Sequence, residues 1–170
     1  PELVNHSGLV WLNRYQTLSD DCSLLSYQLW ENEESIENWR NNKMHRLAQL
    51  DGINAHFKDY RIRVGQRVFC WVKGETIKLS TWSPADSNSL LLCVQSEAVI
   101  PQDSVAKLGS FESAYCGLSA LNHFVTLVRP NELFCTKILE PLTKSDLAYK
   151  IDLFLIGRDY SMARLQHGKA

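Results

Sequence analysis

The residue types that most often do chemistry are present in this chain, but few of them occur at a spacing that specifies a reaction. The five cysteines are far apart and never form a CxxC pair, so their spacing predicts neither a zinc site nor a disulfide framework. No base stands close to Cys116 or Cys135 in the sequence, so a thiol nucleophile has no support. A glycine-rich phosphate loop, an HExxH helix and a GxSxG elbow are also absent. These absences argue against nucleotide, zinc-protease and serine-hydrolase chemistry.

A tryptophan, a histidine and an arginine pair are the strongest single candidates for a functional role. Trp39 and His45 lie on one predicted helix, and Arg61 and Arg63 share one face of the strand that follows it. Trp39 falls within an apolar stripe, where an indole ring usually anchors a core. His45 projects from the opposite side, so a role for it requires that another subunit or the second half of the chain covers that side. The arginine pair suits a solvated or interface position better than an anion clamp.

Composition and charge describe an ordinary globular protein and exclude some partners. The chain has 170 residues, of which 45% are hydrophobic and 22% are charged, enough for one domain or two small ones. A net charge of -1 gives no basic field to attract nucleic acid. The sequence contains no apolar run long enough to span a membrane and no signal pattern at its start. Unpaired cysteines are typical of a reducing compartment, so we predict a cytoplasmic protein without nucleic-acid or membrane partners.

The first half of the chain predicts a strand, a strand, a helix and a strand. Residues 8–18 and 23–31 alternate between apolar and polar types on either side of a polar turn, which predicts a hairpin. Asn32 is a good N-cap for a helix that runs to residue 57, with a break at Gly52. Residues 58–72 return to alternation. The helix should lie on the sheet through a stripe of Ile36, Trp39, Leu47, Leu50, Ile53 and Phe57.

The second half predicts a complete βαβ-βαβ order after a linker at residues 76–88. Its expected elements are a strand at 89–98, a helix at 101–116, strands at 117–127 and 131–140, a helix at 143–157 and a strand at 158–165. This order of strands and helices is that of a ferredoxin-like plait.

The two halves also share residues at a constant offset of 109 positions, which pairs Gly8 with Gly117 and Asn13 with Asn122. Repetition of this kind predicts tandem ferredoxin-like plaits of the α+β class, at residues 1–75 and 89–170. The first plait lacks its initial strand and helix. Two explanations stay open: the chain begins part-way into a longer protein, or a neighbouring chain supplies the missing elements. The symmetry of the two asparagines suits a structural hydrogen bond better than catalysis at one site.

The run from Tyr27 to Val64 resembles the antibiotic biosynthesis monooxygenase (ABM) domain family. It carries the WR-x4-H-x2-AQ helix and the DYRIRV-like strand of some members, with matching residues at Trp39, Arg40, His45, Ala48, Gln49, Asp59, Tyr60, Arg61 and Arg63. The second half has no counterpart of Trp39 or His45. The resemblance implies a dimeric α+β barrel of two plaits packed sheet to sheet. Such a barrel forms either within one chain or in a homo-oligomer through the sheet faces.

The resemblance implies two functions. One is cofactor-independent oxygenation of a small aromatic or polyketide-like molecule, in which the substrate supplies the electrons and neither a cofactor nor a metal is needed. The other is a non-catalytic ligand-binding or regulatory domain. An oxygenase pocket needs apolar walls, polar groups that hold an anion, and exclusion of water. The catalytic residues stay open, and the candidates to line such a pocket are Trp11, Asn13, Tyr15, Tyr27, Trp39, His45, Tyr60 and Arg61.

Haem degradation is the third activity found in proteins that resemble this chain, and the sequence disfavours it. The haem-degrading members use an asparagine, a tryptophan and a histidine that follows the tryptophan by about three helical turns. Here His45 follows Trp39 after only one and a half turns or so, and Gln49 and Leu50 stand where the haem-binding histidine is expected.

Overall fold

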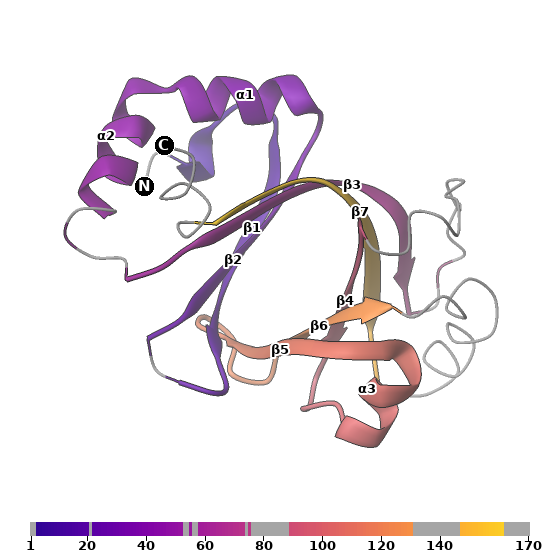
Figure 1. Ribbon diagram of the computed structural model, residues 1–170. Coiled ribbons are helices and arrows are strands. Elements are labelled where there is room, and N and C mark those ends of the chain that lie inside the picture. The colour runs from indigo at the N-terminus through magenta and orange to yellow at the C-terminus, as the bar shows by residue number, and fades with distance from the viewer. Residues whose placement is uncertain are drawn as a thin grey trace, which may run out of the picture. The chain divides into compact units, whose positions relative to one another are not determined.

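The computed structural model describes residues 3–20, 22–52, 55, 58–73, 75, 89–130 and 147–161 (Figure 1). Within them the chain forms seven β-strands, three α-helices and one short 3-10 helix, which confirms the α+β class. The chain divides into two compact units. The first comprises Pro1–Asn13, Ser26–Ile62 and Tyr160–Ala170, and the second comprises Arg14–Leu25 and Arg63–Asp159.

The first unit is built on the predicted hairpin, which the structure confirms. A short 3-10 helix, η1 (Leu3–Asn5), precedes strands β1 (Leu9–Thr17) and β2 (Leu24–Trp30). The amide of Glu31 donates to the carbonyl of Gly8 at 2.9 Å, which joins the open end of the hairpin. The residues of β1 beyond Asn13 belong to the second unit.

Helix α1 (Glu33–Asn41) begins where the sequence predicts, because Asn32 caps it. The Asn32 side chain accepts a hydrogen bond from the Ser35 amide at 2.9 Å, and Glu33 and Glu34 occupy the first turn, where negative charge meets the positive end of the helix dipole.

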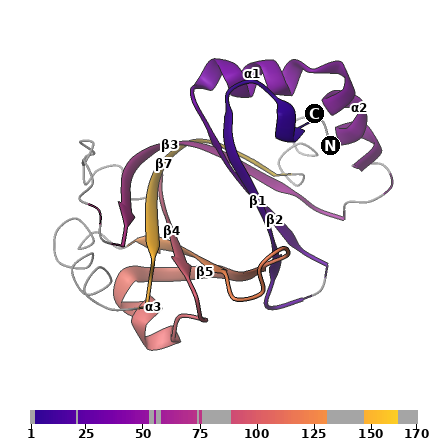
Figure 2. The ribbon, with the colours of Figure 1, turned by 180° about the vertical axis from the view of Figure 1, so that it is seen from behind.

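The predicted break in the helix is found at Asn42 and not at Gly52. The chain leaves the helical conformation at Asn42 (φ -59°, ψ 126°) and starts a new helix, α2 (Lys43–Asp51), whereas Gly52 has helical angles. Figures 1 and 2 both show the change of direction between α1 and α2.

Helix α2 faces the opposite way from the sequence prediction. Its apolar side chains Met44, Leu47 and Leu50 are 55%, 52% and 56% exposed, while His45 and Gln49 are half-buried. The prediction assumed that one stripe continues along the helix and that no break occurs before Gly52. The break at Asn42 restarts the helix on a new axis, so the stripe that includes the half-buried Ile36 and Trp39 of α1 does not continue onto α2. The two remaining members of the predicted stripe lie outside the described residues.

The second unit contains most of the antiparallel sheet. Its strands β3 (Arg61–Val72), β4 (Leu90–Ser96), β5 (Gly109–Gly117), β6 (Phe124–Pro130) and β7 (Lys150–Ser161) follow the order β5-β6-β4-β7-β3, and the end of β1 pairs with β5. In the centre, Cys93 of β4 lies opposite Leu127 of β6 and Asp152 of β7. The core of this unit gathers on one face of the sheet, under helix α3 (Gln102–Leu108). It includes Leu92, Val94, Val105, Leu108, Val128, Ile151 and Leu153.

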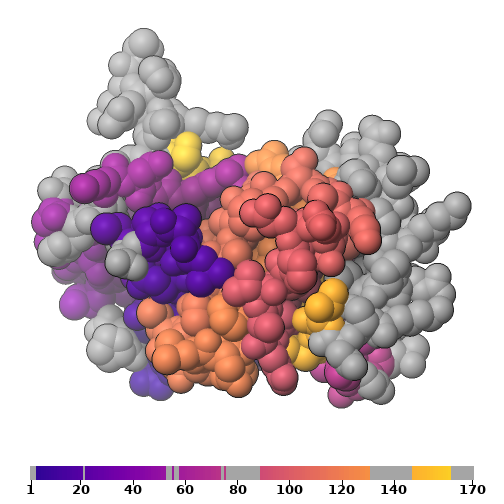
Figure 3. Space-filling model, turned by 90° about the horizontal axis from the view of Figure 1, so that it is seen from below, coloured from indigo at the N-terminus to yellow at the C-terminus, as the bar shows by residue number. Residues whose placement is uncertain are grey.

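One predicted helix is shorter than expected, because a strand begins inside its range. Residues 101–116 were expected to be helical, but α3 ends at Leu108 and β5 starts at Gly109. Gly109 has φ 155°, and a Cβ there would come within 2.0 Å of the Arg129 carbonyl oxygen. Glycine therefore permits the close approach of β5 to β6, and this pairing ends the helix. In Figure 3, α3, β5 and β6 lie at the surface of this unit.

The second expected helix is also wrong over its described part. Residues 143–157 were predicted to be helical, but Lys150–Ser161 forms β7 and pairs with β4. The apolar and β-branched residues of KIDLFLI suit a central strand, and tertiary pairing overrides the local capping signal. The linker at 76–88 and the strand at 131–140 lie outside the described residues. The tandem repeat stays a prediction: Leu9 begins β1, whereas its counterpart Leu118 lies in the turn before β6.

Arg63 of the arginine pair forms an ion pair within the second unit. Arg63 Nη1 lies 2.6 Å from Glu112 Oε2, and Arg129 also binds Glu112. Burial alone would raise the pKa of Glu112, but the two guanidinium groups hold its pKa below the usual value. Arg63 therefore fastens β3 in the second unit, while the exposed Arg61 belongs to the first.

Candidate imidazole–indole site

Four ring side chains of the first unit meet around Trp39, and we call them the imidazole–indole cluster: His6, Trp30, Trp39 and His45. The His45 ring centroid lies 4.3 Å from that of Trp39, and His6 lies 5.1 Å from Trp39 with its ring edge-on. Trp30 of β2 joins through His6, at 5.7 Å. Two of the predicted pocket residues, Trp39 and His45, are thus in direct contact, and His6 is an addition that the sequence did not single out.

Asn42 positions His45 against Trp39. The amide of Asn42 donates to the carbonyl of Trp39 at 3.1 Å. Its side-chain oxygen accepts from the amides of Met44 and His45 at 2.9 and 3.2 Å. One residue therefore ends α1, caps α2 and sets the relative position of the two rings.

A glycine turn positions His6. Gly8 has φ 83°, a left-handed conformation that disfavours other residues, and a Cβ at Gly8 would come within 2.1 Å of Ser35 Oγ. The turn from η1 into β1 can therefore pack closely on the first turn of α1. The Nδ1 atom of His6 donates to the Ser7 carbonyl at 2.9 Å, which leaves Nε2 as the acceptor atom of the neutral ring.

We expect Gly8→Ala to destabilise the protein because it combines a left-handed backbone with a steric conflict at Ser35. The conformational cost alone is about 1–2 kcal/mol, which corresponds to a fall in Tm of about 2–8 °C for a chain of this size. Differential scanning calorimetry would measure it. Gly157→Ala is the matched control, since nothing lies within 4 Å of a Cβ at Gly157, and it should leave Tm nearly unchanged. Equal melting temperatures for both variants would contradict the packing described for Gly8.

His45 has the electrostatic properties of a base. Burial lowers its pKa below the usual value of 6.5, and its place in the first turn of α2, at the positive end of the helix dipole, acts in the same direction. Among the described residues, neither of its ring nitrogens takes part in a hydrogen bond. A neutral, half-buried imidazole of this kind is able to accept a proton from a bound molecule.

The other predicted pocket residues fall into separate places. Trp11 and the buried Tyr27 form an edge-to-face pair across the hairpin of the first unit, with ring centroids 4.7 Å apart. Asn13 is exposed and Tyr60 is half-buried, both in the first unit. Tyr15 is 3% exposed and belongs to the second unit. A single pocket that contains all eight candidates stays a prediction.

The sequence missed a buried polar cluster in the second unit, centred on Asp152. This carboxylate has no exposed surface, and it lies 3.5 Å from Arg67 Nη1, 3.4 Å from Lys150 Nζ and 3.5 Å from Gln95 Nε2. Burial and the neighbouring Asp152 raise the pKa of the Cys70 thiol, so this cysteine is a poor nucleophile. The cluster escaped prediction because residues 150–157 were expected to be helical, which would have separated Asp152 from β4.

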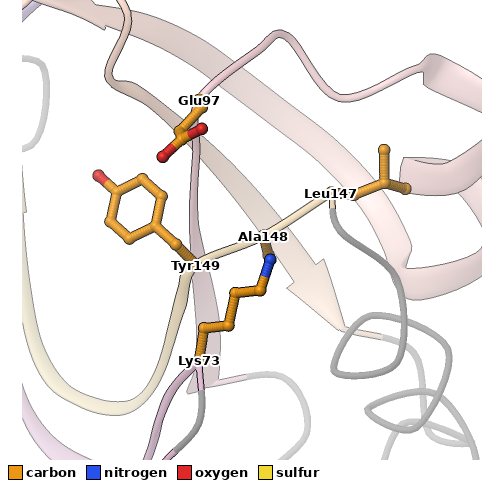
Figure 4. A pocket seen from close by; sticks show the side chains of 5 residues that line it. All are labelled: Lys73, Glu97, Leu147, Ala148 and Tyr149. Atoms are coloured by element: carbon orange, nitrogen blue, oxygen red, sulfur yellow. The ribbon is translucent and has the colours of Figure 1, made fainter.

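A small cavity lies in the same unit (Figure 4), and the hydroxyl of Tyr149 in its lining donates to Gln95 Oε1 at 3.4 Å. It has a volume of about 50 Å³ and is lined by Lys73, Glu97, Leu147, Ala148 and Tyr149. Burial, followed by the proximity of Tyr15 and Glu97, raises the pKa of Tyr149 to about 12. Pockets for organic ligands usually measure about 300–1,000 Å³, so this cavity suits water rather than a substrate.

The structure also bears on metal and membrane binding. In the described part of the chain, no three His, Cys, Asp or Glu side chains group closely enough to hold a metal ion. Across the same ranges, none of the helices has the length and apolar character that crossing a membrane requires.

Comparison with known proteins gives one partial similarity. Over 66 residues the chain is 39% identical to a jasmonate monooxygenase ABM from Pyricularia oryzae. The matched region is 39% of this chain and 31% of that protein, so the chain spans about a third of the length of the curated relative it matches. No family model matches the chain, and no solved structure matches it. The comparison therefore suggests similarity to an ABM-like family over part of the chain.

Proposed function

We propose that this protein is a cofactor-independent monooxygenase of a small aromatic or polyketide-like substrate, with His45 as its base. The observation that carries the proposal is the state of His45, which is half-buried against Trp39 with a lowered pKa. The partial similarity to a monooxygenase supports the same class of reaction. Trp39 supplies apolar surface next to the base, as an aromatic substrate requires.

The proposed reaction needs no electron source besides the substrate. His45 removes a proton from a methylene group that a neighbouring phenol or ketone acidifies, and the carbanion transfers electrons to O2. A C–O bond forms, and the peroxide intermediate loses water to give a carbonyl group. One oxygen atom enters the product and the other leaves as water. The four electrons that reduce O2 come from the oxidation of CH2 to C=O, so the reaction balances without a cofactor.

Oxygen consumption with a dihydroxyanthrone tests this proposal. The wild-type protein should consume one O2 per substrate molecule, as measured with an oxygen electrode, and jasmonate serves as a second candidate because of the name of the relative. Trp39→Phe and Asn13→Ala should lower the rate if these side chains belong to the pocket. Leu24→Ala is the matched control, since Leu24 is exposed, belongs to the second unit and is not a member of the cluster. Absence of uptake with every substrate in this series would remove the enzymatic function.

A second candidate function is a non-catalytic ligand-binding or regulatory domain. The outward apolar side of α2 favours it, because such a surface is typical of assembly rather than of catalysis.

Titration with hemin addresses the third, disfavoured function. We expect no shift of the Soret band, and a saturable shift at a 1:1 ratio would instead support haem binding.

A further inference from the structure

The outward side of α2 has the arrangement of a self-complementary contact. Its two ends carry opposite charges, Lys43 at the first position and Asp51 at the last, and both residues are exposed. Between them lie Met44, Leu47 and Leu50, each more than half exposed. With about 100° between successive residues, all five side chains fall within about 120° of the helix circumference, centred on Leu47. His45 and Gln49 lie on the other side.

These residues are placed symmetrically about Leu47. Apolar residues lie at equal distances on either side of it, and the two outermost residues carry opposite charges. If a second α2 lies antiparallel to the first with Leu47 on the two-fold axis, Lys43 faces Asp51 of the other copy, and Met44 faces Leu50. Each such pair has residue numbers that sum to the same value, as a two-fold axis requires. The apolar side chains then cover one another, and each end of the contact pairs opposite charges.

We propose that a second copy of this chain covers this side of α2, in an antiparallel α2–α2 contact with Leu47 on the axis. This contact is separate from the assembly through the sheet faces that the ABM resemblance implies, and it does not depend on the proposed activity. One nine-residue helix offers a small interface. Interfaces below about 1,200 Å² belong to weak complexes, so we expect a dimer that dissociates on dilution.

Sedimentation equilibrium over a range of protein concentrations tests the proposal. The wild-type chain should show a monomer–dimer equilibrium in the micromolar range or weaker. Leu47→Glu should raise the dissociation constant by at least about tenfold, because two buried carboxylates would face each other across the axis. Leu24→Glu is the matched control, since Leu24 is 62% exposed but lies on the hairpin, and it should leave the equilibrium unchanged. Circular dichroism would confirm that both variants are folded.

Charge exchange tests the antiparallel register. Lys43→Glu and Asp51→Lys should each weaken the dimer, because each places like charges together at both ends of the contact. The double variant should restore the wild-type dissociation constant to within about twofold, since the opposite charges face each other again. A wild-type chain that stays monomeric, or a dimer that Leu47→Glu does not weaken, would overturn the proposal. A double variant weaker than both single variants would overturn the register.

Discussion

His45→Gln should lower the rate of oxygen consumption by about 10²–10⁴-fold, because glutamine fills similar space but cannot accept the substrate proton. General-base catalysis contributes a factor of this size in enzymes that use it. The measurement is kcat/KM from initial rates of oxygen uptake. His123→Gln is the matched control, because His123 contacts Tyr149 in the second unit and has no place in the cluster, and it should keep the wild-type rate.

The pH dependence of the wild-type protein provides an independent check on His45. Burial lowers the pKa of His45 below its usual value of 6.5 in the folded protein, so the neutral imidazole predominates at pH 7. We therefore expect kcat/KM to decrease as the pH falls through the pKa of the folded state, with a midpoint below pH 6.5. The lowered pKa of His45 also links stability to pH. The contribution of the neutral ring to folding is fully present above the unfolded pKa and is lost as the pH falls through the folded pKa. A midpoint above pH 6.5 would argue that another group is the base.

Asp152→Ala should cost about 3 kcal/mol of folding free energy, which is the lower end of the effect of breaking a buried ion pair. The carboxylate is fully buried, and its removal leaves Arg67 and Lys150 without it in the interior of the second unit. Arg67 is one-third exposed and can turn partly toward water, which is why the lower end applies. For a chain of this length we expect Tm to fall by about 6–12 °C.

Asp159→Ala is the matched control for Asp152→Ala, since it removes the same side chain from the same strand. Its carboxylate lies 3.9 Å from Arg63 Nε and is 26% exposed, and partly exposed pairs of this kind contribute about 0–1 kcal/mol. The melting temperature of Asp152→Ala should therefore lie clearly below that of Asp159→Ala when both are measured by thermal unfolding. Similar losses would show that the buried position of Asp152 does not determine its contribution.

Local sequence signals predicted the elements that depend on neighbouring residues. The hairpin of β1 and β2 follows from alternation, the start of α1 from the cap at Asn32, and the strand β4 from a short apolar run, and each of these signals acts over a few residues. The same signals failed at β5 and β7, where they indicated helix. Those segments become strands because β6 and β4 supply partners with which they pair, and a sequence taken alone does not contain that information.

The candidate site shows the same division. The sequence singled out Trp39 and His45, six positions apart on one predicted helix, but it placed them on opposite sides of that helix. Contact between the two rings depends on Asn42, whose break in the helix turns α2 so that His45 faces inward and Leu47 faces outward. His6 offered no signal, because its approach to Trp39 depends on the left-handed turn at Gly8.

The sequence by itself determined the α+β class, the hairpin, the helix cap and two members of the candidate site, since each of these depends on residue types within a few positions of one another. Only the tertiary structure decided which side of α2 is buried, which segments become strands, and that Asp152 meets Arg67 and Lys150. These features depend on contacts between residues far apart in the chain, where the pairing of strands and the burial of charge outweigh local preference.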